Sequence, residues 1–452
     1  MNEGLRVSLV SLGCARNLVD SEVLLGHCAG EGLAIARNPE DADVVVVNTC
    51  GFIDEAKQES IDALLEACQL KADGRIKGVV AVGCLAERYT DDLRKELPEV
   101  DSIQGISDYS GVPQIVREIV NGTPDRMVST VDGGKPKTAR NDLGRVLLTP
   151  QSYAYLRISE GCNHTCAFCA IPSMRGRNVS KPIDVLVEEA KQIAAQGVRE
   201  IVLVAEDSTA YGLDVDKKRR IHELVQAIAD VPELHWVRLM YAYPHTVLPA
   251  LTDVLREHSK VVPYLDIPIQ HISSNMLKAM RRGVSGDQVR GILERLRGEV
   301  PGIALRTTFI VGFPGETEQD FQELEDFVKD FRFERMGAFT YSHEEGTRAF
   351  DLADDVPTEV ADERRDRLML AQQAIHIERN QSLIGQSLEV LVDGLDEDNQ
   401  TVLARTTADA PEVDSVVRLP AGSGKAGELL AIEVTEADDY DLRGRVLGVV
   451  TD

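Results

Sequence analysis

The chain has 452 residues and a net charge of −26, with 75 acidic against 49 basic side chains. At roughly 150 residues per domain, this length predicts about three domains rather than one core. A surface this acidic repels phosphate backbones at long range, so a basic protein is expected as the main partner and nucleic acid is not. No apolar run is long enough to cross a bilayer, and there is no basic and apolar leader, so we expect a cytoplasmic protein without a membrane anchor.

The first part of the chain alternates short apolar strands with helical patterns, which is typical of βαβ units on a parallel sheet. The predicted strands are residues 7–11, 44–48 and 79–82. One cysteine follows each strand within three residues: Cys14, Cys50 and Cys84. The carboxyl ends of parallel strands share one edge, so these cysteines are expected to form a three-thiolate site there. The alternative is that they are ordinary buried cysteines.

The surroundings of these cysteines favour the site. Gly13, Gly51 and Gly83 adjoin them, and glycine lets the backbone come close to a bulky cofactor. Eight cysteines grouped in this way indicate a reducing compartment and metal ligation rather than disulfides. Cys28 and Cys68 fall inside helical patterns and are expected to be thiols without a function.

A domain boundary is predicted within residues 121–151, around a Gly, Pro and Lys run at 133–137. The alternation then resumes with longer units, and six of them suggest a partial parallel barrel whose chemistry gathers at the carboxyl ends of its strands. A long helix over 357–384, ended by Gly385, is expected to close this domain. The predicted strands are residues 155–158, 200–205, 236–241, 262–267, 304–311 and 335–341, with helices such as 184–195 and 320–331 between them.

A cysteine loop follows the first of these strands, with Cys162, Cys166 and Cys169 separated by three and then two residues. Thiolates favour zinc, cuprous copper or iron–sulfur clusters over hard cations. Three ligands suit a cubane cluster that keeps one iron open, whereas structural zinc takes four. A zinc site completed by His164 or by a distant residue is the alternative.

Other strand ends carry polar groups that a small ligand could use. Each group alone could instead cap a helix or satisfy a turn, so only their shared location indicates a ligand. The basic run at 217–220 could mark a nucleic-acid site, but a solvated loop fits this acidic chain better. The strand-end groups are Glu206, Asp207, Ser208, residues 243–245, Gln270, His271 and residues 312–316.

The tail over 386–452 alternates apolar and polar residues in short segments at 388–392, 402–406, 416–419 and 429–434, which predicts a small β-barrel. It contains five basic and fifteen acidic residues, so it cannot hold a phosphate backbone over most of its surface. A basic protein is the expected partner, and a solubilising appendage is the alternative.

Taken together, these motifs resemble the methylthiotransferase branch of the radical S-adenosylmethionine (SAM) superfamily. The resemblance rests on the cysteine loop with Phe168 before its last cysteine, and on residues 171–177, 13–14, 48–52 and 83–85. The tail resembles the TRAM domain. The resemblance implies an α/β architecture of three domains. Residues 1–125 would form an N-terminal methylthiotransferase domain with an open parallel sheet. Residues 150–385 would form a partial (β/α)6 radical SAM barrel, and residues 386–452 a TRAM β-barrel.

The resemblance also implies the cofactors, which are two [4Fe-4S] clusters and SAM. Cys14, Cys50 and Cys84 would hold the auxiliary cluster, and the cysteine loop would hold the cluster that binds SAM. No catalytic residue beyond these ligands is implied. The SAM contacts are expected from Phe168, Arg175, Glu206, Asp207, Ser208, Gln270, Gly312 and Glu316.

In this branch, SAM cleavage gives a radical that removes hydrogen from the substrate, and sulfur from the auxiliary cluster is then inserted. The acidic tail and residues 266–271 favour the β-carbon of an aspartate in ribosomal protein uS12 as the target. A flavodoxin or ferredoxin is the expected electron donor. The alternatives are a tRNA adenosine methylthiotransferase, which a basic tail would have favoured, and a non-catalytic iron–sulfur electron carrier or redox sensor.

Overall fold

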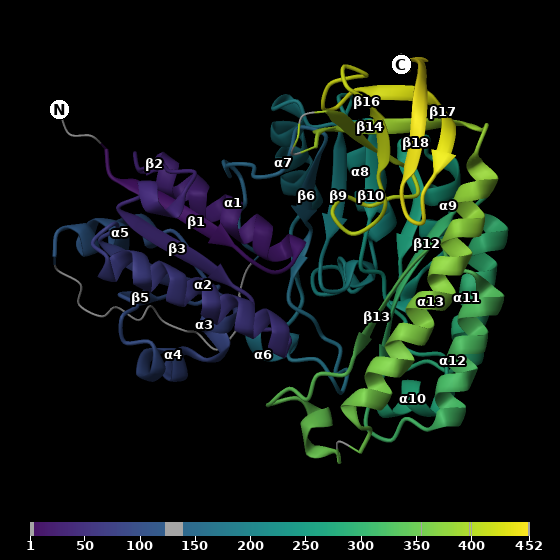
Figure 1. Ribbon diagram of the computed structural model, residues 1–452, viewed down its shortest axis with the longest axis horizontal. Helices are drawn as coiled ribbons and strands as arrows, with labels where there is room; N and C mark the ends of the chain where they lie inside the picture. The colour runs from purple at the N-terminus through teal and green to yellow at the C-terminus, as the bar shows by residue number, and fades with distance from the viewer. Residues whose placement is uncertain (1–3, 123–138, 354, 397, 399, 451–452) are drawn as a thin grey trace. The chain divides into compact units, whose positions relative to one another are not determined.

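The computed structural model describes residues 4–122, 139–353, 355–396, 398 and 400–450 (Figure 1). The predicted boundary run at 133–137 lies outside this range. The chain divides into two compact units, which are considered one at a time. The first comprises Met1–Leu148, Ser159–Thr165 and Cys169–Val179, and the second comprises Thr149–Ile158, Cys166–Phe168 and Ser180–Asp452.

The first unit is built on a parallel sheet with the strand order β2-β1-β3-β4-β5. The three predicted strands are confirmed, and β3 and β4 are buried along their whole length, as expected for strands covered on both faces. The two edge strands contain two residues each, too few to leave a periodic signal. The strands are β1 (Arg6–Ser11), β2 (Ala34–Ile35), β3 (Val44–Thr49), β4 (Gly78–Gly83) and β5 (Ser102–Ile103).

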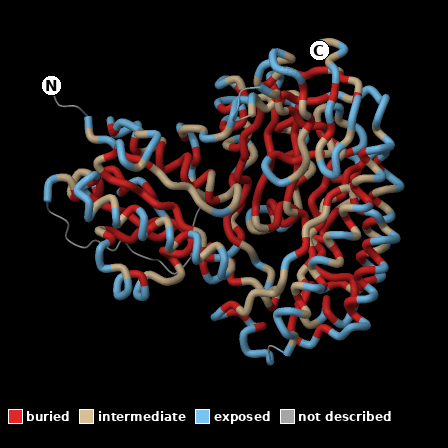
Figure 2. Tube along the Cα trace, viewed as in Figure 1, coloured by how far each residue is buried: buried red, intermediate tan, exposed pale blue. Residues whose placement is uncertain are grey.

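Helices cover both faces of this sheet (Figures 1 and 2). Successive side chains of a strand point to opposite faces, so Val46 packs with Leu24 and Val116 in one core cluster, while Val45 packs with Leu64 in another. The helices are α1 (Ala15–Gly30), α2 (Asp54–Ala72), α3 (Cys84–Arg88), α4 (Thr90–Glu96) and α5 (Val112–Val120), with a 3-10 turn η1 (Pro39–Asp41).

The chain also forms two short strands, β7 (Ser159–Glu160) and β8 (Val179–Ser180), and the single-turn helix α6 (Ile171–Met174). The second unit contains a six-stranded parallel sheet in the order β13-β12-β11-β10-β9-β6, which confirms the predicted partial barrel. Its strands are β6 (Tyr153–Arg157), β9 (Glu200–Val204), β10 (Trp236–Leu239), β11 (Val261–Asp266), β12 (Ala304–Val311) and β13 (Arg335–Thr340).

Helices connect successive strands of this sheet, as the βα alternation predicted. They are α7 (Ile183–Ala195), α8 (Ile221–Ala229), α9 (Pro249–Glu257), α10 (Ser274–Ala279), α11 (Gly286–Glu299) and α12 (Glu318–Phe331), with 3-10 turns η2 (Ser208–Ala210), η3 (Pro244–Thr246) and η4 (Arg348–Asp351). The long helix α13 (Thr358–Leu383) follows, packs against α12 and β13, and lies within the predicted range. No helix within the described ranges combines the length and apolar character needed to span a bilayer.

The tail forms a closed barrel in the order β14-β15-β16-β18-β17, which confirms the prediction of a small β-barrel. The last strand was missed because arginine and glycine interrupt its apolar alternation. The strands are β14 (Ser387–Leu395), β15 (Thr401–Thr406), β16 (Val417–Pro420), β17 (Leu429–Ala437) and β18 (Leu442–Val449).

The segment after β15 places acidic side chains against residues of the six-stranded parallel sheet. Asp409 pairs with the buried Arg335 at the start of β13. Tyr155 and Tyr264 donate hydrogen bonds of 2.7 Å each to Glu412 and Asp414. Part of the acidic charge of the tail is therefore neutralised inside this unit.

A buried arginine of the tail completes this contact. Arg405 lies 2.8 Å from Glu200, the first residue of β9, which also pairs with Arg238 at 2.7 Å. The tail therefore closes the end of the parallel sheet opposite to the carboxyl ends of the strands.

Candidate functional site

The three cysteines of the first unit lie at the carboxyl edge of its sheet. Cys14 precedes α1 three residues after β1, Cys50 follows β3 directly, and Cys84 begins α3 directly after β4. Because β1, β3 and β4 are neighbours in the sheet, their carboxyl ends bring the three thiols to one place. The strand-end positions predicted from the sequence are confirmed.

The glycines beside these cysteines are needed because the strand ends come close to one another. A Cβ atom on Gly13, where φ is +89°, would lie 3.0 Å from Cys50 Sγ. A Cβ atom on Gly51 would lie 2.9 Å from the backbone of Leu85. Glycine therefore lets the three strand ends converge, a role that does not depend on a cofactor.

The three thiols differ in how readily they ionise. Burial raises the pKa of Cys84 to about 12 and also raises that of Cys50. Burial acts in the same direction on Cys14, but the Arg16 and Arg175 guanidinium groups outweigh it and hold the Cys14 pKa below its usual value. Ionised Cys14 and Cys50 would each raise the pKa of Cys84, so the three sulfurs are near one another. A bound metal centre would lower the pKa of all three thiols, because it deprotonates the thiols that bind it.

The two cysteines expected to have no function lie elsewhere. Cys28 is buried in the core beneath α1, where burial raises its pKa to about 12. Cys68 packs against the core beneath α2, where burial raises its pKa to about 11. Both surroundings are those of ordinary packing residues.

Arg175 belongs to the first unit and lies beside its cysteines. Its Nη2 atom is 3.3 Å from Cys84 Sγ and 2.9 Å from Asp20, and its Nη1 atom is 2.7 Å from Glu160. Arg140 bridges the same two carboxylates at 2.9 and 2.6 Å. The resemblance implies that Arg175 contacts SAM, and in the structure its guanidinium is held by two carboxylates of the protein.

Two cysteines of the loop also belong to the first unit. The Cys162 amide donates to Gly176 O, and Cys162 Sγ accepts a hydrogen bond from the His164 amide. Cys162 and Cys169 pack against an apolar cluster that contains Cys84. Side chains from both cysteine sets therefore share one apolar layer in this unit. The buried members of the cluster are Cys84, Ile106, Ala170, Ile171 and Met174.

Cys166 belongs to the second unit, where it contacts a buried arginine and a tyrosine. Arg282 Nη1 lies 3.2 Å from Cys166 Sγ, and Tyr243 Oη lies 3.8 Å from it. The guanidinium stacks 4.2 Å from the Tyr243 ring centre, and the Tyr243 hydroxyl donates to Arg282 O. Sequence reasoning missed Arg282, because no spacing rule connects it to a cysteine 116 residues away.

Several polar residues predicted to bind SAM hold their own loops in place. Asp207 accepts a hydrogen bond from the Thr209 amide at 2.9 Å, and Ser208 Oγ donates to Met240 O at 2.6 Å. Asp207 thus caps the turn η2, as the alternative predicted, whereas Ser208 ties its loop to the residue that follows β10.

Glu316 also has a full set of protein partners. Its carboxylate accepts from the Gly312 amide at 2.6 Å, pairs with Arg364 at 2.8 Å and lies 3.0 Å from His271. These bonds fix the loop from Gly312 to Glu316 after β12. Gly312 has φ of +73°, and a Cβ atom there would meet Ala361, so only glycine fits.

The remaining predicted SAM contacts also follow strands or adjoin the cysteine loop. Glu206 follows β9, and Gln270 follows β11 with φ of +74°, a left-handed conformation that is strained for a residue with a side chain. Phe168 packs against the cluster that contains Met280 and Phe313. All three lie in the second unit.

Among the described residues, no group of three or more His, Cys, Asp or Glu side chains is arranged to hold a single metal ion. In a cubane cluster, each cysteine binds a different iron, so its ligands lie farther apart than those of a mononuclear site. The donor set of thiols at strand ends matches the ligands of iron–sulfur clusters.

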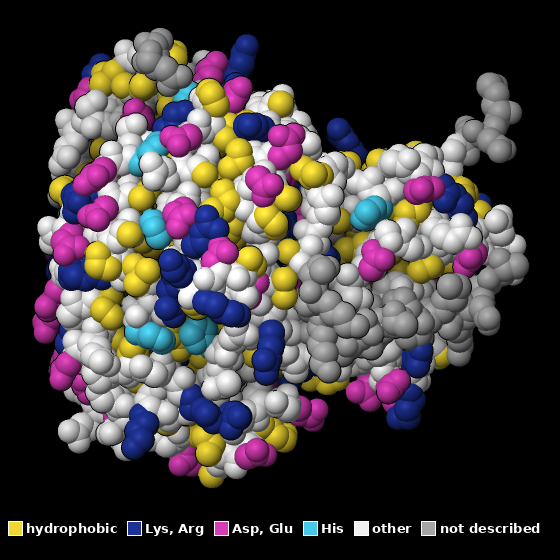
Figure 3. Space-filling model, turned by 180° about the vertical axis from the view of Figure 1, so that it is seen from behind, with side chains coloured by type: hydrophobic (Ala, Val, Ile, Leu, Met, Phe, Trp, Pro, Cys, Tyr) yellow, Lys and Arg dark blue, Asp and Glu magenta, His cyan; other side chains and the backbone are white. Residues whose placement is uncertain are grey.

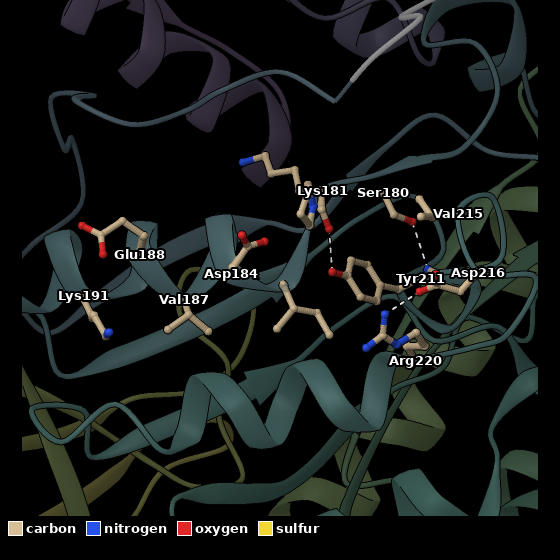
Figure 4. A pocket seen from close by; sticks show the side chains of 13 residues that line it. Ser180, Lys181, Asp184, Val187, Glu188, Lys191, Tyr211, Val215, Asp216 and Arg220 are labelled. Atoms are coloured by element: carbon tan, nitrogen blue, oxygen red, sulfur yellow. Dashed lines mark hydrogen bonds and ion pairs between the residues drawn. The ribbon is translucent and has the colours of Figure 1, made fainter.

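A surface cavity of about 650 Å³ lies elsewhere in the second unit, beside α7 (Figure 4). It is lined by Lys181, Asp184, Tyr211, Asp216 and Arg220 among others, and contains no residue predicted to bind a cofactor. The Tyr211 hydroxyl donates to Lys181 O at 2.6 Å.

The basic run at 217–220 ends at this cavity. Arg220 pairs with Glu223 at 2.7 Å and with Asp216, which fits the prediction of a solvated loop. Figure 3 shows basic and acidic side chains interspersed over the face that it presents.

Three family models match the chain. Residues 156–328 match the radical SAM superfamily, residues 6–105 match an uncharacterized protein family, UPF0004, and residues 384–447 match the TRAM domain. Among solved structures, the radical SAM methyltransferase TsrM from Kitasatospora setae superposes with a TM-score of 0.53 at 16% identity, covering 74% of this chain and 72% of that one. This likeness concerns the fold.

Curated relatives match nearly the whole length. The chain is 46% identical to the ribosomal protein uS12 methylthiotransferase RimO of Anaeromyxobacter sp. (strain Fw109-5), over 98% of this chain and 93% of that protein. It is 45% identical to RimO of Aquifex aeolicus, over 98% and 97%, and 44% identical to RimO of Trichlorobacter lovleyi, over 97% of each. With a radical SAM domain, two sets of cysteines and a C-terminal TRAM barrel, the chain belongs to the RimO family of radical SAM methylthiotransferases.

Proposed function

We propose that this protein inserts a methylthio group at the β-carbon of an aspartate in ribosomal protein uS12. The observation that carries the proposal is the apolar cluster of the first unit, where Cys84 of one cysteine set packs with Cys162 and Cys169 of the other. Sulfur insertion needs a radical source and a sulfur source close together, and proximity of reacting groups lowers the barrier. The RimO relatives are named as ribosomal protein uS12 methylthiotransferases.

Two [4Fe-4S] clusters and SAM are the cofactors of this activity. Cys14, Cys50 and Cys84 would hold the auxiliary cluster, and Cys162, Cys166 and Cys169 would hold the cluster whose open iron binds SAM. When bound, these groups supply the one-electron chemistry that removes hydrogen from an unactivated carbon, and the sulfur that replaces it.

The residues of the chain hold and orient these groups. The apolar side chains Ile106, Ile171 and Met174 exclude water from the cysteines that they touch. Arg282 and Tyr243 fix the direction of the Cys166 side chain.

Several residues at the carboxyl ends of the barrel strands are proposed to contact SAM. Glu316, held by Arg364, keeps the loop after β12 in one conformation. Phe168, Glu206, Gln270 and Gly312 are proposed contacts. Asp207, Ser208 and Arg175 are proposed to act through the residues that they hold.

The partner of the enzyme is a basic protein. The tail keeps acidic residues exposed, such as Glu436 and Asp438, besides those that contact the parallel sheet. Such a surface attracts a basic ribosomal protein and repels nucleic acid. We place the reaction in the cytoplasm, with a flavodoxin or ferredoxin as electron donor. We propose that the chain carries it out with three domains, at 1–125, 150–385 and 386–452.

The proposal is tested in cells that lack this chain. Mass spectrometry of uS12 peptides should show loss of the methylthio group from one aspartate, and a plasmid that carries the chain should restore it. The methylthioadenosines of tRNA should be unchanged. Loss of a tRNA modification with uS12 unaffected would contradict the proposal and favour the tRNA enzyme.

A further inference from the structure

Arg175 is buried, with only 1% of its side chain exposed, and a buried cation needs compensating charge. Asp20 and Glu160 supply that charge at 2.9 and 2.7 Å. Arg140 contacts the same two carboxylates, so two guanidinium groups face two carboxylates. Within this set of four side chains, the two positive charges are matched by the two negative ones.

The contact of Arg175 with Cys84 is therefore additional to the ion pairs. Nη2 lies 3.3 Å from Cys84 Sγ, and the same nitrogen is 3.0 Å from Asn17 Oδ1. Asn17 Oδ1 is in turn 3.7 Å from Cys84 Sγ. Buried carboxylates and an amide thus fix the guanidinium in a position where it donates to sulfur.

A hydrogen bond to a ligand sulfur changes the electronic properties of an iron–sulfur cluster. Reduction adds negative charge that spreads onto the sulfurs, so an N–H donor and a nearby positive charge stabilise the reduced form. Both are strengthened by burial, because water does not screen them.

We propose that Arg175 is a positioning residue for the auxiliary site: it donates a hydrogen bond to the Cys84 sulfur and raises the reduction potential of the cluster held there. The inference rests on the proposed function for the presence of that cluster, and it extends the function by naming the residue that sets the potential. Arg175 directly follows helix α6 and lies six residues after Cys169. One short segment therefore carries a ligand of one cluster and the donor to the other.

The test isolates the auxiliary site. In a parent protein with Cys162, Cys166 and Cys169 all changed to Ala, only the first set of cysteines can hold a cluster. After anaerobic reconstitution with iron and sulfide, the reduction potential is measured by a redox titration followed by electron paramagnetic resonance. In this parent, Arg175→Gln should change the ratio of reduced to oxidised cluster at a fixed potential by about tenfold, in favour of the oxidised form. For a one-electron couple, that corresponds to about 59 mV.

Two further variants separate tuning from folding. Arg175→Lys keeps the charge but loses the planar set of donors, so its potential should lie between those of the parent and Arg175→Gln. Arg145→Gln removes another buried arginine of the same unit, which pairs with Glu22 at 3.1 Å, and should leave the potential unchanged.

Each other outcome refutes a stated claim. A loaded Arg175→Gln protein with the potential of the parent would overturn the inference alone. If Arg175→Gln and Arg175→Lys are folded but bind no cluster, Arg175 has a purely structural role and the tuning proposal is wrong. If the parent itself binds no cluster, the auxiliary site of the proposed function is refuted, and the inference with it.

Discussion

The two parallel sheets place different kinds of side chains at their carboxyl edges. The first sheet presents three thiols, which are proposed to hold the auxiliary cluster. At the second sheet, Asp207 and Glu316 are bonded to their own loops, and Ser208 is bonded to the residue that follows the neighbouring strand β10. Cysteines at strand ends are therefore stronger evidence of a cofactor site than polar residues are, because polar residues have structural uses at the same positions.

The largest effect is expected at the first edge. Cys84→Ala removes one of the three ligands of the auxiliary cluster, so the bound iron should fall to roughly half. The rate of uS12 methylthiolation should fall by more than about 100-fold, since mutation of a residue that only contacts a metal ligand already costs 10–100-fold. Iron analysis and mass spectrometry of uS12 peptides measure the two effects. The control is Cys68→Ala, at a cysteine packed against the α2 core, which should retain full iron and activity. Equal loss in both variants would break the distinction between edge and core cysteines.

At the second edge, Glu316→Gln should act mainly on stability. The change leaves the buried Arg364 without its closest carboxylate, so the free energy of unfolding should fall by about 3 kcal/mol. Chemical denaturation measures it. Glu318→Gln is the matched control, because Glu318 contacts the same arginine at 3.2 Å but its side chain is 65% exposed, and it should cost less than about 1 kcal/mol. Similar losses would show that Glu316 is not the buried partner that holds this loop.

A pH dependence is expected where the tail meets the sheet. Burial would raise the pKa of Asp409, but Arg335 and the Thr406 hydroxyl outweigh it and hold the pKa below its usual value. A lowered folded-state pKa gives stability that is present above the unfolded pKa of about 3.9 and lost as the pH falls through the folded value. Asp409→Asn should therefore be less stable than the natural chain at pH 7, and the difference should shrink in acid. Thermal unfolding of both proteins from pH 7 to pH 3 measures it, and a constant difference would contradict the assignment.

The smallest effect is expected at the cavity beside α7, which contains no residue predicted to bind a cofactor. Arg220→Ala removes exposed ion pairs with Asp216 and Glu223, so the stability should change by less than about 1 kcal/mol and uS12 methylthiolation should be unchanged. Denaturation and a methylthiolation assay check both. A marked loss of activity would give the cavity beside α7 a role that its mixed charges do not suggest.

The sequence predicted the elements whose signals are local. Runs of valine marked β3 and β4, and cysteines within three residues of strand ends marked the first site. The two-residue strands β2 and β5 and the arginine-rich β18 left no such signal. A cysteine loop within eight residues could likewise be read directly, because its ligands are close in the sequence.

Contacts between distant residues could not be read in this way. Arg282 reaches Cys166, and Asp20 reaches Arg175, only after the chain has folded. Arg175 was identified from its motif, but its partners were not, because a motif shows that a cation is present and not which anion it meets. The charge of the tail was counted correctly, yet the count could not show that Asp409 and Glu412 face inward.

The contact between the tail and the parallel sheet has a consequence for how the protein is made. Arg335 begins β13, but its carboxylate partner, Asp409, comes 74 residues later. During synthesis, chains fold from the N-terminus onward as they leave the ribosome. Arg335 therefore lacks this carboxylate partner until the segment after β15 has been synthesised, so completion of the central sheet depends on a part of the chain that is made well after its last strand.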